Sequence, residues 1–142
     1  MVRAMDEAVS VYVVDDDDAV RDSLRALLEP EGFFVKPYAS VNAFLDDMDE
    51  NTPGTGGPAC LLLDLNMPGR GGLDLLAVLA ERDSDLPVVV MTGTLDEGTR
   101  TRALYRGAVA FLEKPVDADQ LIDTLRHACA PVNRTVGIVH EE

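Results

Sequence analysis

Four short apolar runs in this chain of 142 residues are each followed by polar residues that could act together in one chemical site. The runs 11–14, 60–63, 88–91 and 110–112 lead, respectively, into Asp15 and Asp16, into Asp64, into Thr92, and into Glu113 and Lys114. If the runs are neighbouring strands of one parallel sheet, these side chains meet at the edge where open α/β sheets bind ligands. The resulting set of carboxylates, a hydroxyl and an ammonium suits a divalent cation together with a phosphoryl group.

The three aspartates would repel one another if they converge, and they would resist ionising together. A bound Mg²⁺ removes that repulsion, because it takes carboxylate, water and phosphate oxygens as ligands. Asp64 can also act as a nucleophile and form an aspartyl phosphate. Lys114 and the hydroxyl of Thr92 would then offset charge on the phosphoryl oxygens, together with backbone N–H groups that follow Asp64 and Thr92. Each residue alone has an ordinary structural explanation, but their joint position at consecutive strand ends favours a phosphoryl site.

The segments between the runs predict the elements that would position these residues. Continuous apolar runs suit strands buried on both faces, and residues 33–38 predict a further strand, which Pro37 places at a sheet edge. Apolar residues recur at helical spacing in four segments: Val20, Leu24, Leu27 and Leu28, before Pro30 and Gly32; Val41, Phe44 and Leu45, after a capping Ser40; Leu73, Leu76, Ala77 and Ala80; and Leu121, Ile122, Leu125, Ala128 and Cys129, after a capping Asp117. Residues 95–107 predict a further helix, which Gly98 near its start weakens. The alternation predicts a doubly wound, five-stranded α/β fold.

Composition narrows the choice of partners. The net charge of -14 disfavours contact with nucleic acid and with anionic membranes. The acidic stretch 46–50 is interpreted as a solvated loop, and Cys60 and Cys129 as reduced structural thiols. No apolar segment is long enough to span a bilayer, and residues 1–7 lack the apolar region of a signal peptide, so a cytoplasmic protein is expected.

The four motifs, in this order, resemble the receiver domains of two-component response regulators. The resemblance rests on four segments: Val13-Val14-Asp15-Asp16, Leu62-Leu63-Asp64-Leu65-Asn66-Met67-Pro68-Gly69, Met91-Thr92-Gly93 and Phe111-Leu112-Glu113-Lys114-Pro115. It covers about residues 9 to 129. The amino-acid sequence around the motifs is similar to that of the subgroup that includes the nitrogen-fixation regulators. It implies a flavodoxin-like sheet of order 2-1-3-4-5, with a receiver domain at 9–130, an extension at 1–8 and a tail at 131–142.

The resemblance also implies a role for each site residue. Asp64 would be the phosphoacceptor, supplied by a sensor histidine kinase or a histidine phosphotransfer protein. Asp15, Asp16, Asp64 and the backbone carbonyl of Asn66 would hold Mg²⁺, or Mn²⁺ in its place, with Asp15 acting through a water. Three further roles are implied at the other strand ends: phosphoryl contacts by Lys114, Thr92 and Gly93; a switch formed by Thr92 and Phe111; and a cis peptide bond at Lys114–Pro115.

The function expected on these grounds is a phosphorylated signalling domain rather than an enzyme with a separate substrate. Phosphorylation would alter the surface formed by the helix at 95–107, the last strand and the last helix, where Arg100, Arg102 and Arg106 suggest protein docking. A phosphorylation-linked dimer also fits, and the downstream effector is not specified. Two alternatives stay open: an aspartate-dependent phosphohydrolase of the haloacid-dehalogenase type, and a receiver-like interaction module that never gains phosphate. The subgroup usually carries a helix-turn-helix output domain; none is expected within these 142 residues, which would be either a single-domain regulator or a piece of a longer protein.

Overall fold

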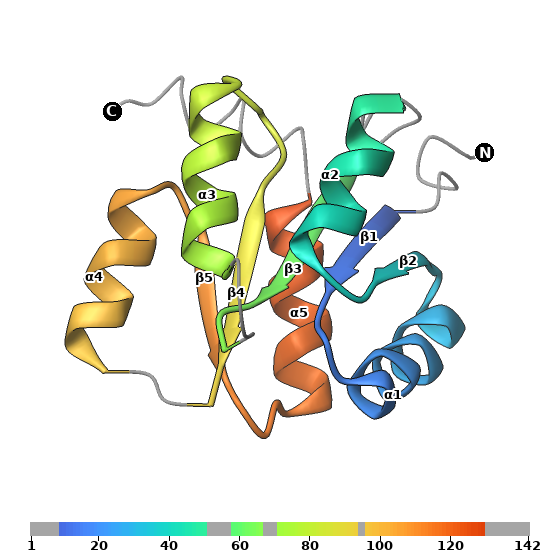
Figure 1. The fold of residues 1–142 in the computed structure, drawn as a ribbon. Coiled ribbons are helices and arrows are strands. Elements are labelled where there is room, and N and C mark those ends of the chain that lie inside the picture. The colour runs from blue at the N-terminus through green and yellow to red at the C-terminus, as the bar shows by residue number, and fades with distance from the viewer. Residues whose placement is uncertain (1–8, 51–57, 67–70, 94–95, 130–142) are drawn as a thin grey trace, which may run out of the picture.

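The computed structural model describes residues 9–50, 58–66, 71–93 and 96–129, and these form one doubly wound α/β unit (Figure 1). Five parallel strands pair in the order β2-β1-β3-β4-β5, which confirms the expected topology. Their bounds are Val9–Val14 for β1, Phe33–Tyr38 for β2, Ala59–Asp64 for β3, Val88–Thr92 for β4 and Ala110–Glu113 for β5. Because every strand runs in the same direction, their carboxyl ends share one edge of the sheet.

Helices follow the strands and cover both faces of the sheet. They are α1 (Asp18–Leu28), α2 (Val41–Glu50), α3 (Gly72–Glu81), α4 (Glu97–Tyr105) and α5 (Ala118–Ala128), with a short 3-10 helix, η2 (Glu29–Glu31), after α1. Helices α1 and α5 pack on one face, and α2, α3 and α4 pack on the other (Figure 1). Within the described ranges, no helix has both the length and the apolar character needed to cross a bilayer.

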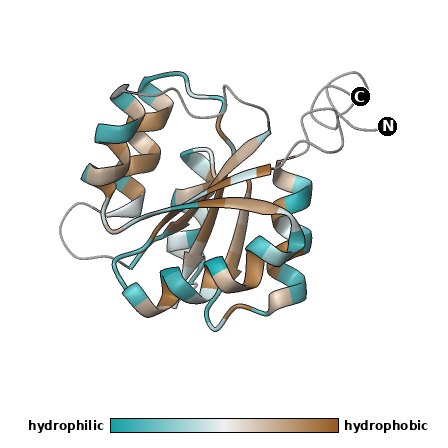
Figure 2. Ribbon diagram, turned by 90° about the vertical axis from the view of Figure 1, so that its right-hand side faces the viewer, coloured by the Kyte–Doolittle hydropathy of each residue, from teal (hydrophilic) through white to brown (hydrophobic). Residues whose placement is uncertain are grey.

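The sheet is apolar on both faces, as Figure 2 shows by the brown strands between helices whose outer sides are teal. One core lies under α1 and α5, where Leu24, Leu28, Leu121 and Leu125 pack against strand residues such as Leu62. The second core lies under α2 and α3, whose side chains enclose Leu61 and Leu63 from the other face. Strand β3 is therefore buried along its whole length, which explains its continuous apolar sequence.

Capping side chains set the helix starts, at Ser40 and Asp117 as expected and also at Asp17. Asp17 accepts a hydrogen bond from the backbone N–H of Ala19, Ser40 accepts one from Ala43, and Asp117 accepts one from Gln120. The end of α1 differs in detail from the expectation. Pro30 lies inside the 3-10 turn that extends the helix, and Gly32, at φ 98°, ends it in the left-handed conformation that glycine adopts at no steric cost.

Two sequence interpretations are corrected by the structure. The acidic stretch 46–50 is not a loop but the second half of α2. Two of its charges have partners: Asp47 accepts from the hydroxyl of Tyr38 and pairs with Lys36, and Asp49 pairs with Arg82. The helix continues because Met48 packs against the core, a contact that the run of charges obscures.

The buried face of α3 is the second correction. Gly72, Leu75, Leu76 and Leu79 face the sheet, whereas Ala80 of the expected stripe is exposed. The helix is apolar on most sides, so its sequence fits more than one stripe, and the sheet selects among them.

The two cysteines lie in the core under α1 and α5, and both are free thiols. Cys60 is on β3, and Cys129 caps the end of α5. A hydrogen bond with Cys129, together with burial, raises the pKa of the Cys60 thiol well above its ordinary value. A neutral, buried thiol is a poor nucleophile, which agrees with the structural role expected for it.

Gly72 allows α3 to begin close against the end of β3. A Cβ at this position would lie 2.6 Å from Cδ2 of Leu65, 3.0 Å from the carbonyl oxygen of Asp64 and 3.2 Å from Cγ of Leu63. We expect Gly72→Ala to lower the free energy of unfolding by about 1–3 kcal/mol through overpacking, less a helix-propensity gain of at most about 1 kcal/mol. Urea unfolding followed by circular dichroism measures this difference.

Gly98 provides the matched control for Gly72. It also lies in the first turn of a helix, but an added Cβ would meet only Oδ1 of Asp96, at an ordinary 3.5 Å. Gly98→Ala should therefore raise stability by up to about 1 kcal/mol. Equal effects of the two substitutions would show that close packing at Gly72 has no energetic consequence.

Candidate functional site

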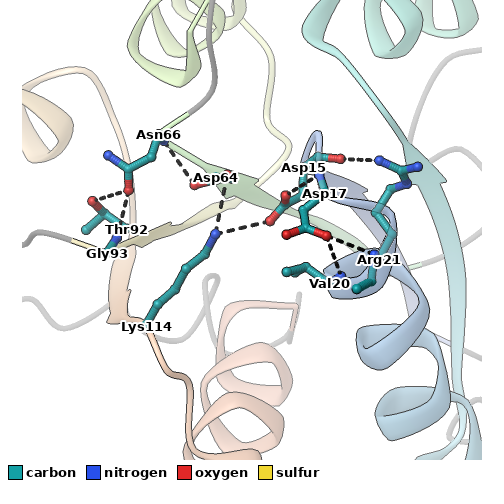
Figure 3. A network of polar contacts seen from close by, with 10 residues as sticks. Asp15, Asp17, Val20, Arg21, Asp64, Asn66, Thr92, Gly93 and Lys114 are labelled. Atoms are coloured by element: carbon teal, nitrogen blue, oxygen red, sulfur yellow. Dashed lines mark hydrogen bonds and ion pairs between the residues drawn. The ribbon is translucent and has the colours of Figure 1, made fainter.

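The carboxyl edge of the sheet brings the expected polar side chains together (Figure 3). Strands β1 and β3 are neighbours with Val14 beside Leu63, so Asp15 and Asp64, the next residues, lie next to each other. Strand β4 pairs with β3 on its other side, and Thr92 at its end lies beside Glu113 of β5. Lys114 follows Glu113 and reaches back across the edge toward the aspartates.

Two buried carboxylates share the ammonium of Lys114. Its Nζ lies 3.3 Å from Oδ2 of Asp15 and 3.4 Å from Oδ2 of Asp64. The other oxygens of these carboxylates accept backbone hydrogen bonds of 2.9 Å, from the N–H of Asp17 to Asp15 and from that of Asn66 to Asp64. Asp15 is 0% exposed and Asp64 is 2% exposed, so both carboxylates depend on these few donors.

The electrostatics of the site follow from this arrangement. Burial raises the pKa of Asp15, and the neighbouring Asp64 adds to the shift, while the bond from Asp17 and the charge of Lys114 oppose it. For Lys114, burial alone would lower the pKa, but the carboxylates of Asp64 and Asp15 outweigh burial and raise it. Lys114 therefore stays charged, and Asp15 carries a charge that its surroundings compensate only in part.

A third carboxylate completes an acidic cluster. One oxygen each from Asp15, Asp16 and Asp64 lie within 4.8 Å of one another, and Asp16 is exposed where the other two are buried. The donors are hard oxygen atoms, the type that Mg²⁺ takes. The incomplete compensation of charge at Asp15 gives a cation an electrostatic reason to bind, and the exposed Asp16 gives it a route from solvent. The residues thus fit a hard divalent cation.

The amide side chain of Asn66 links the ends of β3 and β4. Its Oδ1 accepts a hydrogen bond of 2.8 Å from the hydroxyl of Thr92 and one of 2.7 Å from the backbone N–H of Gly93 (Figure 3). The sequence analysis gave the backbone carbonyl of Asn66 a ligand role and did not indicate these two side-chain contacts. The sequence does hold a signal for these contacts, because Asn66 places a side-chain amide acceptor only two residues after Asp64.

Phe111 and Pro115 lie on and just after β5, the strand that leads into Lys114. Phe111 on β5 is half-buried, and the guanidinium carbon of Arg100 on α4 lies 5.4 Å from the centre of its ring. This cation–π contact joins α4 to β5, and the sequence alone did not indicate it. The peptide bond between Lys114 and Pro115 is cis, as expected.

Arg21 is a second contact that sequence reasoning missed. Its Nη1 donates a hydrogen bond of 2.6 Å to the carbonyl oxygen of Asp15, and its Nη2 pairs with Asp18. The guanidinium therefore fixes the backbone at the acidic pair from the first turns of α1. Its position six residues after Asp15 gave no periodic signal, because the contact depends on how α1 folds back against the end of β1.

Comparison with known proteins agrees with this geometry. The family model described as the response regulator receiver domain matches residues 11–126. The chain belongs to the response regulator receiver family. It is 43% identical over 122 residues to the transcriptional regulatory protein FixJ of Azorhizobium caulinodans, covering 86% of this chain and 56% of that protein. It thus spans about half the length of such relatives.

Solved structures give the same result for the receiver fold. The crystal structure titled FixJ-N is similar at a TM-score of 0.76 and 33% identity, over 87% of this chain and 94% of that one. Full-length FixJ from B. japonicum matches at a TM-score of 0.76 and 36% identity, over 88% of this chain and 61% of that one. The receiver family and its likeness to nitrogen-fixation regulators, both expected from the motifs, are confirmed.

The raised pKa of Asp15 in this receiver domain predicts a pH-dependent cost in stability. A carboxyl whose pKa is raised on folding destabilises the folded state when ionised, and that cost vanishes below the ordinary pKa of 3.8, where both states are protonated. In EDTA at neutral pH, Asp15→Asn should therefore be more stable than the wild type. The gain should shrink as the pH falls and disappear below about pH 4.

Denaturant unfolding across this pH range measures the effect, with Asp46→Asn on the exposed side of α2 as the matched control. The control should show no such pH-dependent gain. A wild type that is more stable than Asp15→Asn at neutral pH would mean that Lys114 compensates Asp15 completely.

Proposed function

We propose that this receiver domain accepts a phosphoryl group on Asp64 from the phosphohistidine of a sensor kinase or a histidine phosphotransfer protein. The observation that carries the proposal is the position of Asp64 at the centre of the edge. Its carboxylate is buried beside the ammonium of Lys114, and the next strand ends in the donors Thr92 and Gly93. A carboxylate nucleophile and cationic and neutral donors are the groups that phosphoryl transfer to an acid requires.

Each group has a defined task in the transfer. A carboxylate oxygen of Asp64 forms a bond to phosphorus as the bond from phosphorus to the donor imidazole nitrogen breaks. The imidazole leaves with that electron pair. Lys114 would release Asp64 and pair with a phosphoryl oxygen, and Thr92 and the N–H of Gly93 would donate to another. Positioning and charge compensation of this kind supply most of the catalysis in phosphoryl transfer.

The cluster of Asp15, Asp16 and Asp64, with the backbone carbonyl of Asn66, would hold Mg²⁺, and Mn²⁺ can take its place. When bound, the cation neutralises charge on the carboxylates and on the phosphoryl oxygens. Asp15 would act through a water. The exposed Asp16 is open to a hydrated ion.

The signal would leave the site through Thr92 and Phe111. Thr92 would move toward the phosphoryl group, and Phe111 would turn inward from its half-buried position beneath Arg100. Helix α4 is suited to respond, because Ala103 is the one buried residue among Glu97–Tyr105. The exposed Leu104, Tyr105 and Val109 provide an apolar surface there for a downstream protein or for a second copy of the domain.

The relatives named above are transcriptional regulators, so we propose control of transcription as the output of the protein in which this domain acts. The net charge of -14 argues that DNA contact belongs to a different part of such a protein.

The phosphohydrolase alternative needs a general acid two residues after the nucleophilic aspartate. That position is Asn66, an amide that does not titrate and whose oxygen is already engaged by Thr92 and Gly93. Its nucleophile would also follow the first strand, whereas Asp64 ends β3. The chemistry therefore favours one phosphorylation per chain over repeated turnover.

The test of Asp64 is phosphorylation by acetyl phosphate and Mg²⁺, resolved on a Phos-tag gel and repeated with a panel of histidine kinases. The wild type and Asp46→Asn should give a shifted band, and Asp64→Asn should give none. A band that persists in Asp64→Asn would place the phosphate elsewhere. Absence of the band from the wild type with every donor would favour the unphosphorylated interaction module, and sustained release of phosphate would favour the phosphohydrolase.

Cation binding is tested separately, by stability. A ligand held only by the folded state at 100 times its Kd raises the free energy of unfolding by about 2.7 kcal/mol. We expect Mg²⁺ to stabilise the wild type and Asp46→Asn by comparable amounts, and Asp16→Asn by much less at the same concentration. Urea unfolding with and without Mg²⁺ gives the comparison. Equal stabilisation of Asp16→Asn would remove Asp16 from the ligand set.

A further inference from the structure

We propose that the side chain of Asn66 is an internal competitor of the phosphoryl group. In the phosphate-free domain its carboxamide oxygen accepts the two hydrogen bonds, from Thr92 and Gly93, that the phosphoryl group would take. The inference rests on the proposed function, because it takes Asp64 as the phosphoacceptor. It assigns Asn66 a second role, distinct from any contact of its backbone carbonyl with a cation.

The contacts that carry the inference converge on one atom. Oδ1 of Asn66 lies 2.8 Å from the hydroxyl oxygen of Thr92 and 2.7 Å from the backbone nitrogen of Gly93. An amide oxygen has two lone pairs, and these donors occupy both. Thr92 is 0% exposed, so the amide oxygen provides its hydroxyl with a partner inside the protein.

The backbone of Asn66 ties this competitor to the phosphoacceptor itself. Its N–H donates a hydrogen bond of 2.9 Å to Oδ1 of Asp64, while the preceding N–H of Leu65 donates one of 2.9 Å to the carbonyl of Met91 on β4. Any group that joins the carboxylate of Asp64 therefore changes the acceptor of the Asn66 N–H. The segment that carries the competing amide thus senses the phosphorylation directly.

The exchange of acceptors has a definite direction. A phosphoryl oxygen is charged, and charge-assisted hydrogen bonds are roughly twice as strong as neutral ones. Thr92 and Gly93 would therefore leave the amide for the phosphoryl group, but only after breaking two formed bonds. Asn66 consequently weakens the net binding of a group at the phosphoryl position, because two hydrogen bonds must break first. Until such a group binds, Asn66 holds Thr92 in one defined position.

Beryllium trifluoride, added with Mg²⁺, is the probe of this competition, because it occupies the phosphoryl position on a carboxylate without a phosphate donor. Its affinity for the domain is the quantity measured. We expect Asn66→Ala to bind it roughly 5-fold to 150-fold more tightly than the wild type, from the net strength of two neutral hydrogen bonds. Asn42→Ala, an exposed asparagine on α2, is the matched control and should bind as the wild type does. Titrations followed by NMR give the affinities.

A double-mutant cycle separates competition from a general effect of the amide. In a Thr92→Val background one of the two donors is gone, so Asn66→Ala should tighten binding by clearly less than it does in the wild type. An equal gain in both backgrounds would mean that Asn66 acts by bulk or by its dipole and not through Thr92. Equal or weaker binding by Asn66→Ala in the wild-type background would overturn the inference outright.

The Gly93 amide provides a readout that needs no phosphorylation. In the phosphate-free domain, Asn66→Ala should move the Gly93 amide proton upfield as its hydrogen bond is lost, and Asn42→Ala should leave it in place. An unmoved Gly93 resonance contradicts the competing contact while leaving the role of Asp64 intact. A wild type that neither binds beryllium trifluoride nor accepts phosphate overturns the proposed function, and the inference with it.

Discussion

The constraint on which the site depends is the burial of two carboxylates beside one ammonium. Asp15 and Asp64 are almost fully removed from water, and Lys114 lies within 3.4 Å of both. Unpaired charges cannot be held in that position, so the last strand must deliver Lys114 to the ends of β1 and β3. The order β2-β1-β3-β4-β5 places both aspartates on adjacent central strands, and the length of the lysine side chain spans the remaining distance from β5.

Compensation by Lys114 is incomplete, and this incompleteness would favour binding of a cation at the site. The pKa of Asp15 stays raised even with the lysine and the Asp17 amide in contact, so the folded domain holds negative charge that a cation would relieve. A fully neutralised pair would be more stable but would have no electrostatic reason to bind a metal or to exchange Lys114 for a phosphoryl oxygen. The stability lost at the edge is supplied by the apolar cores on the two faces of the sheet.

The sequence predicted those features that depend on chain order and local pattern. Strand ends locate Asp15, Asp64, Thr92 and Lys114 because parallel strands share one carboxyl edge, and capping residues locate the helix starts. Prediction from the sequence failed where a local pattern fits more than one structure and tertiary contacts decide between them. The apolar stripe of α3 is ambiguous until the sheet selects it. The acidic half of α2 is helical because Met48 packs against the core, while Asp47 and Asp49 find partners on other elements. The contacts of Arg21, Arg100 and the Asn66 amide likewise join segments that periodicity does not relate.

These long-range contacts divide the edge into two halves with different characters. Around Asp15 and Asp64 the partners are charged, so the state of that half is governed by ions. At the end of β4 the hydroxyl of Thr92 and the Gly93 amide share one oxygen of Asn66, a neutral acceptor. A phosphoryl group on Asp64 would contact both halves at once, since Asn66 is bonded to Asp64 through its N–H and to Thr92 through its side chain. The neutral hydrogen bonds of Thr92 and Gly93 to Asn66 are the ones that a charged phosphoryl group can replace. Because Thr92 ends β4, a change in these bonds would act on β4 and on the neighbouring α4 and Phe111.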